Sequence, residues 1–164
     1  MDVRHKIVTS QVMMPHHANP AGNVHGGEIM KFMDSAAAAV AQKYSKGNCV
    51  TARVDSLEFH LPVFVGALVT CTAYIVYVGR TSMEVLVITE SEDLESNSGP
   101  QKALSAHFTM VCMGRNGRPQ AIGKEYVPET EDEIRLYNAA LEEHVNKRSR
   151  DKKGHTEASE CCNK

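Results

Sequence analysis

The spacing of apolar and polar residues changes once along the chain, near residue 47. Residues 28–44 contain no proline or glycine, and their apolar side chains cover much of the helical circumference, which is typical of a buried helix. Gly47 is predicted to end this helix in the left-handed conformation. Runs rich in β-branched and aromatic residues predict one strand before the helix and four after it: residues 6–14, 50–59, 67–78, 82–90 and 102–113.

The links between the later strands are short and turn-like, which favours antiparallel pairing of neighbouring strands. A helix that is apolar on most sides is buried most economically by a sheet that curls around it. We therefore predict an α+β hotdog fold over residues 1–128, with an antiparallel sheet wrapped around one long central helix.

The C-terminal segment has a different character. Thr130 and Glu133 fit a capping box, which predicts a peripheral helix over residues 129–148. Residues 149–164 are polar and lack periodicity, so we expect a disordered tail. The predicted apolar stripe of the helix consists of Ile134, Tyr137, Leu141 and Val145.

Composition excludes several classes of protein. With 164 residues and a net charge of -2, the chain has the size of one domain with a tail and lacks a nucleic-acid footprint. The five cysteines are odd in number and lack metal or redox spacing, so we expect reduced thiols. Since neither a signal peptide nor a membrane-spanning stretch is visible, we expect a cytoplasmic protein without a membrane partner.

Candidate chemistry begins in the loop 16–27, which leads into the central helix through Gly26 and Gly27. The first backbone N–H groups of a helix have no intrahelical acceptor, and the helix dipole is positive there. A polarised carbonyl oxygen would be held well at this point. The alternative is that the two glycines only allow a tight turn.

Asp34 is a carboxylate among mostly apolar helix positions. Burial should raise its pKa and favour a general base, unless hydrogen bonds or a cation counteract this effect. The alternative is a structural aspartate bonded to a strand or to Ser35. Because Gly26 and Asp34 are eight residues apart on one helix, about 12 Å of axial rise separates them. If both act on one atom, a partner subunit must supply one of them, and the dimer is the catalytic unit.

Three motifs carry a family resemblance. Residues 19–34 (NPAGNVHGGEIMKFMD), 54–59 (VDSLEF) and 78–84 (VGRTSME) resemble the signature of cytosolic acyl-CoA hydrolases of the hotdog superfamily. The resemblance covers roughly residues 6–128 and implies hydrolysis of acyl-CoA to CoA and a carboxylic acid, with no cofactor. It also implies self-association, as a homodimer or a trimer of dimers.

The resemblance assigns roles to individual residues. It implies that Asp34 activates water as general base, or attacks as nucleophile, and that Asn19 of another subunit completes the site. Beside this catalytic group, which includes Gly26 and Gly27, the residues expected to bind substrate or CoA are Asn23, His25, Phe59, Gly79, Arg80, Thr81 and Ser82.

Other interpretations of the histidines and of the whole pocket stay open. His25 could act in acid–base chemistry, as a hotdog dehydratase or hydratase would require, but its place beside Gly26 favours a role in orienting the loop. His16 and His17 are expected to face solvent, and no metal spacing links His60 and His107. A non-catalytic acyl-CoA sensor would use the same pocket and signal through the C-terminal tail.

Overall fold

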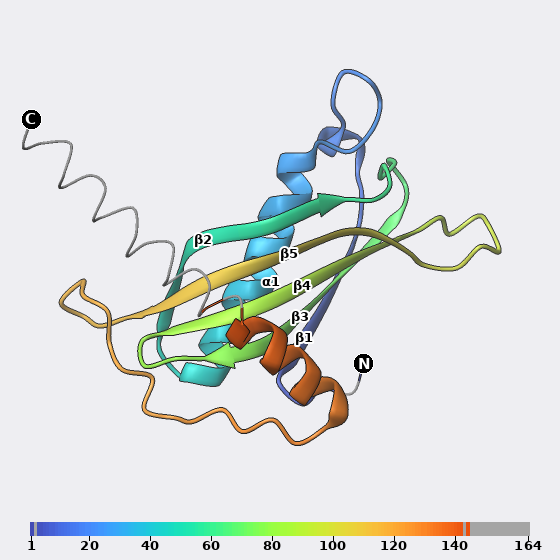
Figure 1. The fold of residues 1–164 in the computed structure, drawn as a ribbon. Helices are drawn as coiled ribbons and strands as arrows, with labels where there is room; N and C mark the ends of the chain where they lie inside the picture. The colour runs from blue at the N-terminus through green and yellow to red at the C-terminus, as the bar shows by residue number, and fades with distance from the viewer. Residues whose placement is uncertain (2, 143, 145–164) are drawn as a thin grey trace, which may run out of the picture.

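A computed structural model describes residues 1, 3–142 and 144. One long helix lies against a five-stranded sheet (Figure 1). A short 3₁₀ turn, η1, covers Pro15–His17. The main elements are β1 (Lys6–Val12), α1 (Gly26–Ser45), β2 (Asn48–Phe59), β3 (Leu68–Val78), β4 (Ser82–Glu92) and β5 (Gln101–Met113).

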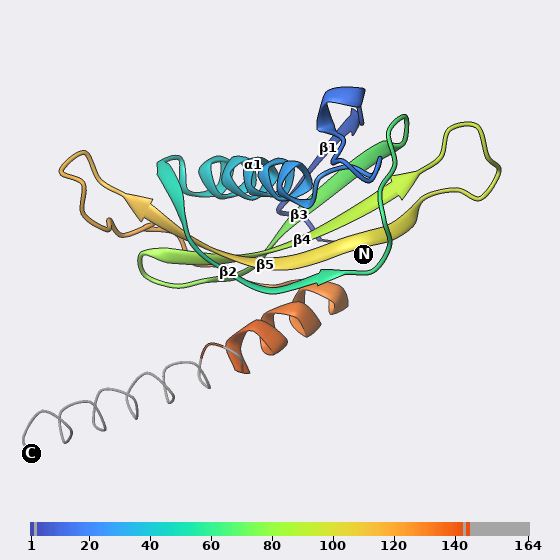
Figure 2. The same ribbon diagram turned by 90° about the horizontal axis from the view of Figure 1, so that it is seen from above.

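All neighbouring strands pair antiparallel, in the order β1-β3-β4-β5-β2. This order leaves β2 at one edge of the sheet, next to β5 and far from β1. The sheet curves around α1, which lies across its concave face (Figure 2). The predicted hotdog arrangement is therefore confirmed.

The core lies between α1 and the sheet. Met33, Ala37 and Ala41 of the helix are completely buried, and Phe108 and Met110 of β5 are buried on the sheet side. Alanine adds little bulk, so the helix axis can approach the sheet closely while its apolar face stays out of water. The alanine-rich stretch thus fixes how near to the sheet any polar group on α1 can lie.

The end of α1 differs from the prediction for Gly47. Lys46 adopts the left-handed conformation, with φ 57° and ψ 21°, and its N–H donates to the Gln42 carbonyl at 2.9 Å. Gly47 follows the cap, and a Cβ there would lie 3.0 Å from the Cys112 sulfur. The glycine is therefore needed for close packing against β5, while a lysine carries the positive φ.

A second helical segment, residues 131–142, packs on the opposite face of the sheet (Figure 2). The predicted capping box is present, since the Glu133 N–H donates to Thr130 Oγ1 at 3.1 Å and the Thr130 N–H donates to Glu133 Oε2 at 3.4 Å. Tyr137 packs against the core as predicted, but the rest of the described apolar stripe is wrong in phase, because Ile134 and Leu141 are 44% and 36% exposed while Glu133 and Ala140 are buried. The expected end of this helix, Val145 and the expected tail lie outside the described residues.

Two further expectations concern cysteines and membranes. Cys49, Cys71 and Cys112 are free thiols and are buried, and Cys161 and Cys162 lie outside the described residues. Among the residues that the structure describes, no helix combines the length and apolar character needed to cross a bilayer.

Candidate active site

Asn19 organises the loop that leads to α1. Its side-chain Oδ1 accepts hydrogen bonds from the N–H groups of Ala21 at 2.9 Å and Asn23 at 3.2 Å, and its own N–H donates to the Asn23 carbonyl at 2.7 Å. Two backbone donors fix the oxygen end of the amide. The NH₂ end is then the part of Asn19 that remains to act on a ligand, as a hydrogen-bond donor.

The two histidines before this loop behave differently from one another. His16 is exposed, as predicted, but His17 is buried and its Nδ1 accepts from the Met14 N–H at 2.9 Å. The His17 carbonyl in turn accepts from the His25 N–H at 2.8 Å. The expectation that His17 faces solvent is therefore wrong, because its side chain accepts from the Met14 backbone and its carbonyl accepts from the N-cap residue of α1.

His25 is the N-cap of α1. Its Nδ1 accepts from the Gly27 N–H at 3.1 Å, and its carbonyl accepts from the Glu28 N–H at 2.9 Å. In the absence of substrate the Gly27 N–H is thus engaged by the His25 ring, and its role in polarising a substrate carbonyl stays a prediction. Within the described part of the chain, the Gly26 N–H has no hydrogen-bond acceptor. The donor available at this helix end is Gly26.

Phe59 lies directly against Gly26. A Cβ built on Gly26 would come within 3.2 Å of two carbon atoms of the Phe59 ring, although Phe59 itself is 58% exposed. The last residue of β2 and the first residue of α1 therefore form one continuous surface, with an apolar ring beside a free backbone donor. Glycine is required here for close approach of the ring.

Asp34 is half-buried on α1 and accepts a short hydrogen bond at Oδ1 from the hydroxyl of Thr51 on β2. Thr51 also contacts the Met110 sulfur at 3.4 Å. Sequence reasoning missed Thr51. The available signal was its place in the strand: Cys49 is buried and Val50 is exposed, so Thr51 points inward toward the helix.

The structure keeps Asp34 apart from Gly26 within one chain. Both lie on the same uninterrupted helix, so about 12 Å of axial rise separates them. Since β2 is an edge strand, Asp34 and Thr51 lie at the side of the molecule where another sheet edge could pair. The two halves of the predicted site therefore come from the first residue and from near the middle of the same helix.

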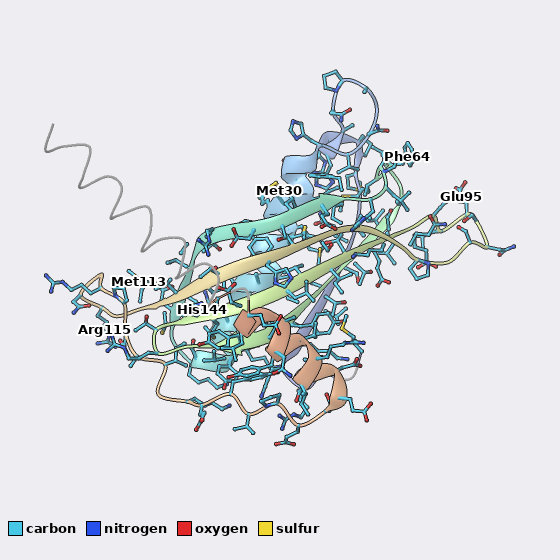
Figure 3. All side chains as sticks on the ribbon, in the orientation of Figure 1. Met30, Phe64, Glu95, Met113, Arg115 and His144 are labelled. Carbon is cyan, nitrogen blue, oxygen red and sulfur yellow. The ribbon has the colours of Figure 1, made fainter. Side chains whose placement is uncertain are left out.

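The residues from Gly79 to Ser82 lie far from Gly26. They form the β3–β4 turn, closed by the Gly79 N–H donating to the Ser82 carbonyl at 2.8 Å, and Arg80 is exposed. Ser82 pairs with Val111 and Asn48 with Met113, so this turn lies beside the carboxyl end of α1. Figure 3 shows Met113 and Arg115 at one end of the molecule and Phe64 and Glu95 at the other, where Phe64 pairs with Asn23 of the loop.

Cavities in the described part of one protomer lie beside these groups without uniting them. One of about 550 Å³ lies between the loops 61–67 and 91–101 and is lined by none of the predicted site residues. A cavity of about 200 Å³ lies beside the first turns of α1, lined by Met13, His17 and Phe32 among others. Groups of His, Cys, Asp or Glu that could hold a metal ion are not found among the described residues.

Comparison with known proteins places this arrangement in a family. Residues 21–96 match the thioesterase superfamily. The cytosolic acyl coenzyme A thioester hydrolase of Mus musculus is 34% identical over 154 residues, which cover 90% of this chain and 40% of that protein. The chain therefore spans well under half the length of this relative.

Solved structures agree with the sequence matches. A hexameric acyl-CoA thioesterase in its apo form is 30% identical, with a TM-score of 0.82 over 90% of this chain and 94% of that one. An acyl-CoA hydrolase from Staphylococcus aureus, solved with butyryl coenzyme A, coenzyme A and coenzyme A disulfide, is 27% identical, with a TM-score of 0.80 over 93% and 92% of the two chains. This chain belongs to the acyl-CoA thioesterase family of the thioesterase superfamily.

Proposed function

We propose that this protein hydrolyses acyl-CoA thioesters at a site shared by two copies of the chain. The observation that carries the proposal is the Asp34–Thr51 pair at the sheet edge. This pair is separated from the free Gly26 N–H by about 12 Å along the axis of α1. A thioester needs a base for water and a donor for its carbonyl oxygen, and a single chain holds these groups too far apart.

A relative supports the choice of residues. Structures exist of three variants of the Staphylococcus aureus hydrolase in which an asparagine, an aspartate or a threonine is replaced by alanine. In that protein the asparagine precedes the aspartate by fifteen positions, and the threonine follows the aspartate by seventeen. Asn19, Asp34 and Thr51 are separated by the same two intervals.

In the proposed reaction, the Asp34 carboxylate removes a proton from water, and the water oxygen attacks the thioester carbonyl carbon. The Gly26 N–H of the partner subunit stabilises the negative charge that develops on the carbonyl oxygen. The C–S bond then breaks, the CoA thiolate leaves, and the proton on Asp34 passes to the thiolate or to solvent. Thr51 donates to Oδ1 of Asp34, so in this proposal Oδ2 is the oxygen that accepts the proton from water.

The amide NH₂ of Asn19 would orient the attacking water or the carbonyl oxygen as a donor. A covalent route, in which Asp34 attacks and forms a mixed anhydride, uses the same residue. A single turnover in ¹⁸O-labelled water tests the covalent route. Label found in Asp34 supports the anhydride, whereas label found only in the released acid agrees with general-base catalysis and with water attack on the acyl carbon of the anhydride.

The first test measures release of CoA thiol from a panel of short to long acyl-CoAs. Wild type should hydrolyse a subset of the panel, and Asp34→Asn should lose most of that rate while remaining folded and associated. Binding of acyl-CoA without thiol release would support the sensor instead. Deletion of residues 149–164 further distinguishes a thioesterase from a sensor. Hydrolysis should survive the deletion, whereas a sensor that acts through the tail would be silenced.

A mixing experiment tests whether the site is shared. Asp34→Asn and Asn19→Ala oligomers should each be nearly inactive. After unfolding and refolding together in equal amounts, half the dimers are mixed and each carries one intact site of two, so about a quarter of wild-type activity should return. No recovery would mean that Asp34 and Asn19 act within one chain.

We further propose that no metal or other cofactor takes part, that the working assembly is a trimer of dimers, and that the protein acts in the cytosol. The hexameric relative and the relatives described as cytosolic support the last two points. Dialysis against EDTA should leave the rate unchanged, and fractionation should place the protein with cytosolic markers. Light scattering should give a mass of six 18.0 kDa chains.

A further inference from the structure

A basic pocket lies at the carboxyl end of α1, outside the site described above. It holds about 150 Å³ and is lined by Arg4 and Lys6 from the N-terminal segment, Lys43 and Lys46 from the end of α1, and Lys124. The lining contains no carboxylate. Five cations gathered from three separate segments contrast with a chain whose net charge is -2.

The positive charge of this pocket is only partly neutralised. Arg4 is paired with Glu129 at 2.7 Å and with Glu133 at 3.1 Å. None of the four lysines forms an ion pair with a carboxylate in the part of the chain that the structure describes. The negative end of the α1 dipole accounts for Lys43 and Lys46, which belong to that helix end, but not for Lys6 and Lys124.

Aromatic side chains hold part of this cluster in place. The Lys124 ammonium lies 4.5 Å from the centre of the Tyr44 ring, whose hydroxyl donates to the Glu125 carbonyl at 3.0 Å. The His5 ring packs edge-on against Tyr44, with 5.0 Å between centroids. Burial lowers the pKa of His5, and the neighbouring charges of Lys124, Arg4 and Lys43 lower it further. Lys124, Arg4 and Lys43 therefore act on the same ring and line the same pocket, so their positive charge is concentrated there.

The pocket faces away from Asp34 and Thr51 of the same chain. Lys43 follows Asp34 by nine residues, so the two side chains leave the helix about half a turn apart in direction and about 13 Å apart along the axis. Asp34 points toward β2, whereas the pocket lies between α1 and the beginning of β1, at the other edge of the sheet. A ligand in the pocket therefore does not touch Asp34 of the same chain.

We propose that this pocket binds a phosphate group of a small phosphorylated ligand. The volume is below the roughly 300–1,000 Å³ of pockets that enclose a whole small molecule, so one phosphate enters and the remainder stays outside. Several flexible ammonium groups suit a compact dianion that accepts hydrogen bonds from many directions. The phosphate belongs either to a separate metabolite or, resting on the proposed function, to the CoA part of the substrate.

The test is calorimetric titration of inorganic pyrophosphate into the full-length protein at low salt. Lys43→Ala combined with Lys124→Ala should raise the dissociation constant roughly tenfold, because two charge-assisted contacts are lost. The control combines Lys102→Ala with Arg115→Ala, which removes the same charge from exposed positions outside the pocket and should change the constant less than twofold. Circular dichroism and mass in solution confirm that both variants fold and associate.

A second titration at saturating CoA separates the two sources of phosphate. Unchanged pyrophosphate affinity assigns the pocket to a separate ligand, and displacement by CoA assigns it to the substrate's own phosphates. The proposal is overturned if wild type binds pyrophosphate no better than the Lys43/Lys124 variant, or if the control loses as much affinity. Since the readout is binding, failure of acyl-CoA hydrolysis would leave this result interpretable.

Discussion

Glu133 anchors the C-terminal helix to the start of the chain, and its replacement gives a quantitative prediction. Its carboxylate is 0% exposed and accepts hydrogen bonds from the Arg4 N–H at 2.9 Å, from the Arg4 guanidinium at 3.1 Å and from the Glu129 N–H at 2.8 Å. Burial alone would raise the pKa of Glu133, but the hydrogen bonds from Arg4, Glu129 and Thr130 outweigh it and lower the pKa to about 2.

The pKa of Glu133 sets both the size and the pH range of the effect. A folded-state pKa of about 2 against an ordinary value of 4.5 corresponds to about 3 kcal/mol at neutral pH. Because the folded-state pKa is the lower one, this stabilisation is complete well above pH 4.5 and is lost as the pH falls toward 2. At pH 3.5 roughly half of it should already be gone.

Glu133→Gln keeps the shape of the side chain and removes its charge. The free energy of unfolding in urea, at fixed chain concentration and pH 7, should fall by about 3 kcal/mol. Glu131→Gln, an exposed neighbour in the same helical turn, should cost less than about 1 kcal/mol. The difference between wild type and Glu133→Gln should stay nearly constant from pH 6 to pH 5 and should shrink from there to pH 3.5; a difference that stays constant down to pH 3.5 would refute the linkage argument.

Three further predictions concern α1 and its neighbours. Thr51→Val should lower kcat roughly tenfold with little change in KM, because the lost hydrogen bond only positions Asp34. Thr51→Ser keeps the hydroxyl and should retain most of the rate. Equal rates for both variants in steady-state kinetics would contradict this prediction. Gly26→Ala should lower kcat/KM, because its Cβ meets the Phe59 ring at 3.2 Å. Adding Phe59→Leu should restore part of the loss. No recovery would mean that contact with the Phe59 ring is not the cause of the loss. Ala37→Leu should cost about 1–3 kcal/mol in thermal or urea unfolding, since Ala37 is completely buried; an unchanged midpoint would mean that the helix can move away from the sheet.

Local sequence signals located most of the fold. The apolar run 28–44 and the β-branched runs after it sufficed to place α1 and the strands within a few residues, because each pattern reflects burial of that segment alone. The capping box at Thr130 is equally local. The helix N-cap at His25 escaped the same reasoning, since histidine is not among the common capping residues.

Features that depend on distant partners were not accessible in this way. The C-terminal helix turns Glu133 inward because Arg4, 129 positions earlier, meets it there, so the phase of the apolar stripe was misjudged. Thr51 acquires its importance from Asp34 across the helix–sheet interface. A polar residue in a strand carries no mark in sequence of the group that it will contact.

The geometry of α1 is the reason for proposing that association and catalysis are linked in this protein. The helix is uninterrupted and packed by alanines against the sheet, so Gly26 and Asp34 stay about 12 Å apart along its axis. A second copy related by a two-fold axis runs its helix in the opposite direction, which can place one Gly26 beside the other Asp34 and creates two equivalent sites. Under the proposed shared site, the same rigidity that separates the groups within a chain would fix their separation between chains, and the edge strand that carries Thr51 would serve both association and the orientation of Asp34.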